Sequence, residues 1–414
     1  MKRNSILASL VFAGEAVFFL PFVMARIFRP TLLNVFDISN TELGSYFSVY
    51  GIIAMISYIF GGVLADRVSS RILMALALWL TSLGGFIMIF IPPSSTMYII
   101  YGFWGFTTIF LFWAAMIRTT REWGGSDFQG RAFGWLEGGR GAVAATLGTI
   151  AFVVFSIIVP DAQTELVPDN KHAFQMVVLV ISLLTVVAGI IIWIVLPDKQ
   201  IQLRQGSPEL SLAKVKQLAK NPVLWMLSII IICAYSGYKI TDDFSLYARE
   251  VLGFSETGAA GIGTLALWLR AIVAIAAGYL GDRVKRTHVI QFSFILILLS
   301  ALLTASGWIS QVLALILMNI ALTAVGIYAV RALYFSVFNE AGIPMKLTGT
   351  TVGIVSFLGF APDVYMSPWM GHMLDNNPGE TGHQLVFLVL GGFAFVGMIM
   401  TFLFGRYSAK LKEQ

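Results

Sequence analysis

Four basic side chains stand inside long apolar stretches of the sequence, where a charge is costly. They are Arg26, Lys239, Arg270 and Arg331. An ionisable residue in such a setting normally faces a partner, a cavity or a ligand. A guanidinium group pairs with carboxylate, phosphate or sulfonate oxygens through two parallel hydrogen bonds. We therefore expect these four side chains to bind an anionic substrate, although Arg26 and Arg331 could also lie at a membrane interface.

Three carboxylates in apolar stretches are candidates for a second kind of chemistry. They are Glu15, Asp242 and Asp363. Desolvation favours the neutral form of a carboxyl group, which suits reversible proton coupling. Asp242 and Asp243 follow Lys239 at i+3 and i+4, so we expect an ion pair within one helix. Glu137 and Arg140 are also three residues apart, and we interpret them as a structural pair.

A short motif occurs twice at half the length of the chain. Gly-Gly-Val-Leu-Ala-Asp-Arg at 61–67 returns as Gly-Tyr-Leu-Gly-Asp-Arg at 278–283, and Asp66 and Asp282 are 282 − 66 = 216 residues apart in a chain of 414. Each copy ends an apolar segment and opens a basic loop. Such a repeat predicts two homologous bundles and is typical of secondary transporters. A simpler interpretation is that each Asp-Arg pair only caps a helix.

The composition predicts the elements that must position these residues. Apolar residues make up 57%, charged residues 12%, and the mean hydropathy is +0.82, whereas a soluble domain carries about 25% charge. A membrane-spanning helix needs about 20 mostly apolar residues. Twelve such spans are expected, near 5–28, 42–64, 72–92, 97–117, 133–159, 173–196, 222–245, 257–280, 289–309, 311–337, 348–371 and 384–404.

The basic residues indicate how the spans are oriented. Most Lys and Arg residues fall at the chain ends and in alternate loops, which would share one face. By the positive-inside rule, both termini are cytoplasmic and the protein is a multi-pass protein of the inner membrane. This placement explains the net charge of +5 without a nucleic-acid partner.

The spans divide into two halves. We predict an N-terminal six-helix bundle at 1–196, a cytoplasmic linker at 197–221 and a C-terminal six-helix bundle at 222–414. Spans 3, 6, 9 and 12 carry no ionisable residue in their apolar parts, which is expected of helices that face lipid. The other eight spans would enclose a polar cavity near the bilayer midplane.

Several functional classes find no support. The four histidines lack zinc-like spacing, so no metal site is expected, and no Walker-type nucleotide motif occurs. No nucleophile triad or carboxylate pair stands out, so the chain is not expected to be an enzyme or to need a cofactor. Transport would then draw on an ion gradient or on exchange.

The doubled motif between spans 2 and 3 and between spans 8 and 9 resembles the signature loop of the major facilitator superfamily. That resemblance covers essentially the whole chain and implies an all-α membrane protein with twelve transmembrane helices in two pseudo-symmetric six-helix bundles. It also implies a conformational gate at the motif residues, which are Gly62, Asp66, Arg67, Gly278, Asp282 and Arg283.

Shorter stretches resemble one branch of that superfamily, the organophosphate:phosphate antiporters. The stretches are 26–44, 118–123, 221–225 and 242–250. The branch places one Arg on span 1 and one on span 7 to hold phosphate. The nearest counterparts here are Arg26 and Lys239, so a lysine replaces the second arginine and two acids follow it.

Together these observations predict a monomeric secondary transporter that moves a small organic anion, by proton coupling or by exchange with a counter-substrate. The anion would be a phosphate ester, a carboxylate or a sulfonate. One alternative is a proton-coupled exporter of cationic or amphiphilic drugs, with Glu15 and Asp363 as counter-charges for the drug. The many aromatic residues would suit such a substrate. Another is a non-transporting membrane sensor on a transporter scaffold.

Overall fold

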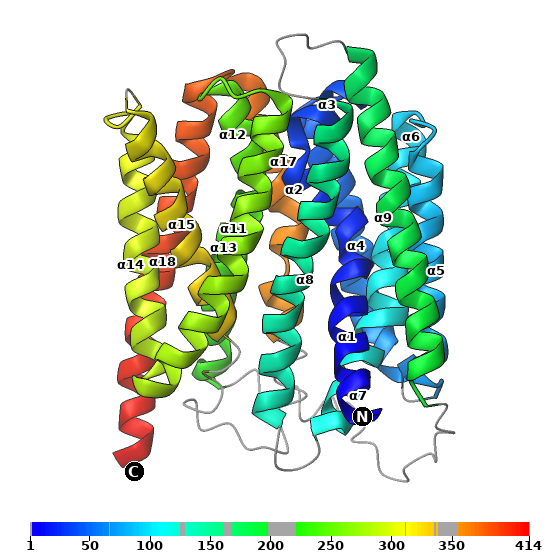
Figure 1. The fold of residues 1–414 in the computed structure, drawn as a ribbon. Helices are drawn as coiled ribbons and strands as arrows, with labels where there is room; N and C mark the ends of the chain where they lie inside the picture. The colour runs from blue at the N-terminus through cyan, green and yellow to red at the C-terminus, as the bar shows by residue number, and fades with distance from the viewer. Residues whose placement is uncertain are drawn as a thin grey trace. The chain divides into compact units, whose positions relative to one another are not determined.

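The structure is a computed structural model, and it describes residues 2–65, 67–124, 129–159, 167–197, 221–310, 312–334, 337 and 355–413. These residues form helices joined by short turns (Figure 1). The helices are α1 (Lys2–Phe18), η1 (Phe19–Val23), α2 (Met24–Ile27), α3 (Arg29–Phe36), α4 (Asn40–Ala65), α5 (Ser70–Met88), α6 (Ser94–Gly105), η2 (Phe106–Trp113), α7 (Ala114–Gly124), α8 (Gln129–Ile158), α9 (Val167–Val195), α11 (Pro222–Ile240), η3 (Thr241–Asp243), α12 (Phe244–Glu250), α13 (Glu256–Arg283), α14 (Arg286–Ala305), α15 (Leu313–Leu333), α17 (Pro362–Asn376) and α18 (Glu380–Glu413).

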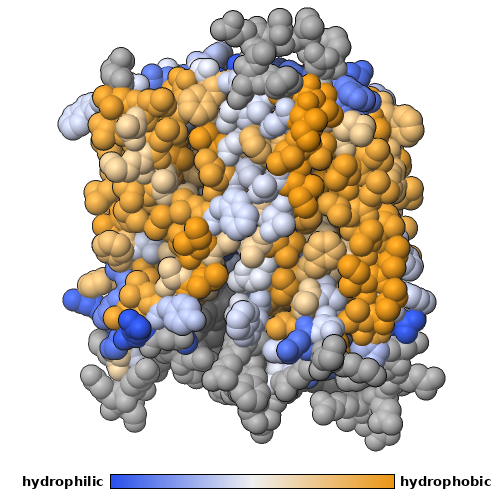
Figure 2. All heavy atoms as spheres, in the orientation of Figure 1, coloured by the Kyte–Doolittle hydropathy of each residue, from blue (hydrophilic) through white to orange (hydrophobic). Residues whose placement is uncertain are grey.

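The predicted membrane spans are found as helices. In the described part of the chain, 10 helical segments are long and apolar enough to cross a membrane. The second predicted span, 42–64, is the 26-residue helix α4. The eleventh, 348–371, begins outside the described residues and ends within α17. In the view of Figure 2, hydrophobic side chains cover most of the middle of the helices, apart from a strip of weakly hydrophilic ones, and strongly hydrophilic side chains gather near the helix ends. Such a surface is suited to lipid.

Contacts group the chain into two compact units. Unit 1 consists of Met1–Leu203, Asp242–Ala271 and Ser367–Asp375, and unit 2 consists of Arg204–Thr241, Ile272–Met366 and Asn376–Gln414. Two segments of the second half of the sequence therefore pack with the first half. The division predicted from the sequence at 197–221 stays a prediction, because 198–220 lie outside the described residues.

In unit 1, the first helix is broken where the sequence contains proline. Pro21 has no amide to donate, and the backbone passes through the π-helical turn η1 before α2 begins. Arg26 lies in α2 and Arg29 opens α3 after a second break at Phe28. The breaks turn both arginines toward buried partners instead of spreading them along one continuous helix.

Unit 2 contains α11, which begins and ends at clear signals. Asn221 caps it by accepting a hydrogen bond from the Val223 amide at 3.0 Å, and Pro222 occupies its first position. The helix stops at Ile240, and the 3₁₀ turn η3 follows. Lys239 thus belongs to the last turn of α11, whereas Asp242 lies beyond its end.

The four charge-free spans pair with one another as their composition suggests. In unit 1, α5 packs along α9, and in unit 2, α14 packs along α18 and α15 (Figure 1). All four helices present large hydrophobic side chains at the surface, among them Leu83, Ile194, Leu299 and Phe395. These faces are suited to lipid.

Candidate functional site

A buried carboxylate of unit 1 lies between two guanidinium groups. Glu15 on α1 pairs with Arg270 on α13 at 3.1 Å and with Arg140 on α8 at 3.3 Å. Its side chain is only 2% exposed. Arg140 also pairs with Glu137 at 2.7 Å, and that glutamate is 49% exposed. The four charges sum to zero, so the cluster is neutral when both glutamates are ionised.

A second pair in unit 1 joins residues that are 216 positions apart. Nε and Nη2 of Arg26 lie 2.7 Å and 2.6 Å from Oδ1 of Asp242, and both side chains are inaccessible to solvent. Ser245 on α12 donates a hydrogen bond to the Arg26 carbonyl at 2.9 Å. Nearby, Nε of the buried Arg29 donates to the Asn40 side chain at 3.0 Å. These contacts join α2 to η3 and α12, and α3 to the start of α4.

Unit 2 contains the third pair, between α11 and the start of α17. Nζ of Lys239 lies 3.5 Å from Oδ1 of Asp363. Tyr235 stands one turn before Lys239 on the same helical face and donates its hydroxyl to the carboxylate, 3.1 Å from each oxygen. The Arg331 guanidinium stacks 3.6 Å above the Tyr238 ring, a cation–π contact. We call these residues the Lys239 cluster.

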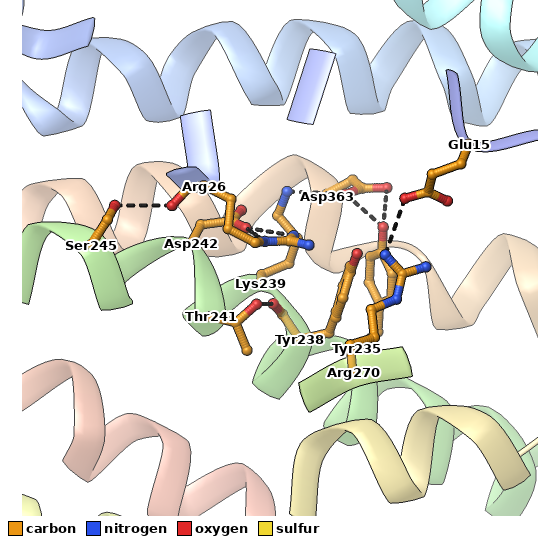
Figure 3. A network of polar contacts seen from close by, with 10 residues as sticks. All are labelled: Glu15, Arg26, Tyr235, Tyr238, Lys239, Thr241, Asp242, Ser245, Arg270 and Asp363. Atoms are coloured by element: carbon orange, nitrogen blue, oxygen red, sulfur yellow. Dashed lines mark hydrogen bonds and ion pairs between the residues drawn. The ribbon is translucent and has the colours of Figure 1, made fainter. Parts of the chain in front are cut away.

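Figure 3 shows the residues of the three pairs as sticks. In each pair, a cation predicted to bind substrate contacts a carboxylate predicted to bind a proton. Arg26 pairs with Asp242, Arg270 with Glu15, and Lys239 with Asp363. Taking one partner from a buried pair leaves the other charge without compensation, which is strongly unfavourable. Loss of the carboxylate charge in any of these pairs would therefore favour another anion beside its basic partner.

The structure adds partners that the sequence did not show. Asp242 was expected beside Lys239 on one helix; α11 ends at Ile240, the 3₁₀ turn η3 follows, and Asp242 contacts Arg26. Glu15 and Asp363, each isolated in the sequence, both have basic partners in the fold. The pairing of Glu137 with Arg140 is confirmed.

Some residues of the clusters could not be singled out from the sequence. Tyr235 and Tyr238 are two of 13 tyrosines in an aromatic-rich chain, and only their contacts with Asp363 and Arg331 distinguish them. Arg140 was interpreted as a partner of Glu137 alone, and its contact with Glu15 depends on how α1 and α8 pack. A spacing of i, i+4 between Tyr235 and Lys239 was the one available signal.

The motif predicted to form a gate is only partly described. Asp66 lies outside the described residues, as does the side chain of Asp282. Arg67 and Arg283 are exposed. Neither Gly62 nor Gly278 has a described heavy atom within 4 Å of where a Cβ would stand. The gating role stays a prediction. Among the described residues, no group of three or more His, Cys, Asp or Glu side chains could hold a metal ion.

The family model of the Major Facilitator Superfamily matches residues 7–362. The chain belongs to this superfamily and is therefore a transporter by family, not an enzyme. Inner membrane protein YqcE of Escherichia coli (strain K12) is 31% identical over 416 residues, covering 97% of this chain and 94% of YqcE. Inner membrane protein YihN of the same organism is 24% identical, covering 100% and 98%.

A solved structure shows the same fold. A bacterial homologue of the human lysosomal transporter Spinster, in an inward-facing and unoccupied conformation, matches with a TM-score of 0.74 at 14% identity and covers 99% of this chain and 98% of its own. The all-α fold of a multi-pass membrane transporter, predicted from the sequence, is thus confirmed. At that identity the likeness concerns the fold and leaves the substrate open.

Proposed function

We propose that this protein is a secondary active transporter that carries a small organic anion together with a proton across the inner membrane by alternating access. The substrate would be a phosphate ester, a carboxylate or a sulfonate. Both termini would lie in the cytoplasm. The three ion pairs would be the elements that link the anion to the proton.

The Lys239 cluster supports the proposal that the substrate is an anion. Two of its members are basic: Lys239 pairs with Asp363, and Arg331 stacks on Tyr238. Lys239 is 1% exposed, so water screens its charge poorly. Basic side chains that line a site raise the local concentration of anions. Planar oxyanions suit the guanidinium of Arg331.

The pairing itself supports proton coupling. When Asp363 binds a proton, its ion pair with Lys239 is lost, and an incoming anion can take that place beside Lys239. The same reasoning applies to Glu15 with Arg270 and to Asp242 with Arg26. Proton and anion then favour each other's binding by the same factor, because linkage is reciprocal. Anion affinity should rise as the pH falls.

Export of cationic drugs is supported less well. That mechanism would use Glu15 and Asp363 as counter-charges for the drug. Both are already paired with basic side chains. A drug cation would have to compete with Arg270 or Lys239 for either carboxylate.

A thermal-shift screen tests the proposal. Purified protein would be heated with sugar phosphates, carboxylates, sulfonates or lipophilic cations at an acidic and a neutral pH, since a ligand of the native state raises the Tm. We expect an anion to raise the Tm of the wild type, more at acidic pH, and to have no effect on Lys239→Gln. Lys171→Gln, which neutralises an exposed lysine, is the matched control. A shift with cations alone would contradict the proposal.

A further inference from the structure

The ends of α14 and α18 form a cavity that the transport proposal does not use. Its volume is ≈ 390 Å³, and it lies wholly within unit 2, between the start of α14 and the last turns of α18. The residues that matter for its chemistry are Lys285, His288, Gln291, Arg406, Ser408 and Ala409. None of the described residues that line it is acidic.

The cavity combines positive charge with unsatisfied polar atoms. Lys285 and Arg406 are exposed and positively charged. Oε1 of Gln291 and Oγ of Ser408 are buried but make no hydrogen bond within the described part of the chain, and Ser408 is 6% exposed. Buried polar atoms normally have a hydrogen-bond partner. A ligand with both a negative charge and hydroxyl groups would satisfy this set.

Apolar surface continues from the cavity along both helices. Phe292 and Leu299 on α14 and Phe395, Phe402 and Leu403 on α18 are exposed. Fatty acyl chains can cover such a surface while a headgroup occupies its charged end. Basic pockets between transmembrane helices are known to bind anionic headgroups in this way. A small soluble anion would leave the adjoining hydrophobic face unexplained.

The first half of the chain has a bulky side chain at the corresponding position. Counting 216 residues, the spacing of the two motif copies, Ala409 on α18 corresponds to Trp193 on α9. Trp193 packs against Trp79 of α5 with ring centroids 5.9 Å apart, and the Arg71 guanidinium lies 4.3 Å above the Trp193 ring. An alanine in place of this tryptophan leaves the space open between α14 and α18.

We infer that the cavity binds the headgroup of an anionic phospholipid, with its phosphate at Lys285 and Arg406 and its hydroxyls at Gln291 and Ser408. The acyl chains would lie along the exposed apolar faces of α14 and α18. The cavity shares no residue with the three ion pairs, so the lipid would be a structural partner of unit 2 and independent of the transported anion.

Two variants test separately whether lipid binding depends on the space in the cavity or on its positive charge. Ala409→Trp fills the cavity with the side chain that the first half uses, and leaves every charge in place. Lys285→Gln combined with Arg406→Gln removes the charges and leaves the space. Lys171→Gln on α9 is the control for loss of an exposed lysine elsewhere.

Delipidated full-length protein would be titrated with phosphatidylglycerol, phosphatidylcholine or inorganic phosphate while its Tm is followed. Native mass spectrometry would count the lipids retained. We expect phosphatidylglycerol to raise the Tm of the wild type and of Lys171→Gln, and both cavity variants to lose that shift and the retained lipid. Equal effects of the two lipids, or unchanged binding in both variants, would overturn the inference. A shift with inorganic phosphate alone would show a soluble-anion site and would also overturn it.

Discussion

At Glu15, one buried carboxylate compensates two guanidinium groups, and Glu137 offers a natural comparison. Both glutamates contact Arg140, but Glu15 is 2% exposed and Glu137 is 49% exposed. Solvent screens the second contact and not the first. The sequence shows two acids and two bases in apolar stretches, and it does not show that they meet.

Glu15→Gln should therefore lower stability far more than Glu137→Gln. Removing one partner of a buried pair costs about 3–5 kcal/mol, whereas an exposed pair contributes roughly 0.2–1 kcal/mol. We expect a clearly lower Tm for Glu15→Gln in detergent and a nearly unchanged one for Glu137→Gln. Equal losses in the two variants would mean that burial does not set the strength of these contacts.

Asp363 is the residue at which proton and anion binding can be separated. Asp363→Asn imitates the protonated carboxyl group and leaves Lys239 and Arg331 without that counter-charge. Anion affinity, measured by calorimetry with a sulfonate, should rise and lose the part of its pH dependence that Asp363 supplies. Tyr235→Phe removes a hydrogen bond to Asp363 but no charge, so its affinity should keep the pH dependence of the wild type. An Asp363→Asn variant that titrates like the wild type would exclude this carboxylate from coupling.

At the scale of elements, the ends of helices decide which residues meet. The charge pattern and the lengths of the apolar stretches predict the helices well, because the formation of a helix depends on local sequence. The break after Ile240 could not be predicted in that way, since Thr-Asp-Asp is compatible with one more helical turn. Beyond this break Asp242 pairs with Arg26, and before it Lys239 pairs with Asp363. Both partners lie on other helices.

The cap of α4 gives a second prediction at this scale. In unit 1, Asp375 at the end of α17 accepts the Asn40 and Thr41 amides at 3.0 Å and 2.7 Å. Burial raises the pKa of Asp375, but the hydrogen bonds from Thr41 and Asn40 outweigh it, so the pKa lies below the ordinary 3.8. The cap therefore stabilises the fold above that value, and its contribution is lost as the pH falls below it.

Asp375→Asn should weaken this cap by about 1–2 kcal/mol at neutral pH, because a hydrogen bond to a charged group contributes about 1.5–3 kcal/mol and a neutral one about 0.5–1.5 kcal/mol. The difference in Tm between wild type and variant should persist down to mildly acidic pH and vanish below the ordinary pKa of the carboxyl group. Thermal unfolding over a series of pH values measures it. A difference in Tm that already disappears near neutral pH would contradict the lowered pKa of Asp375.

At the scale of the whole molecule, composition and the doubled motif lead directly to a membrane transporter, because both features reflect the lipid solvent and the duplicated architecture. The ion pairs depend on packing between residues 124 to 255 positions apart, since 363 − 239 = 124, and no local pattern encodes such contacts. The substrate is still harder to predict from the sequence. It depends on the arrangement of a few side chains, whereas the fold that holds them is common to many transporters.

The central claim is that an anion and a proton bind together, and the pH dependence of anion affinity tests it most directly. A sulfonate from the screen is the best probe, because its own charge stays constant between acidic and neutral pH. We predict that its Kd for the wild type weakens with rising pH, by up to about tenfold per pH unit where one linked proton is released. A Kd that is independent of pH, or that strengthens as the pH rises, would contradict the account.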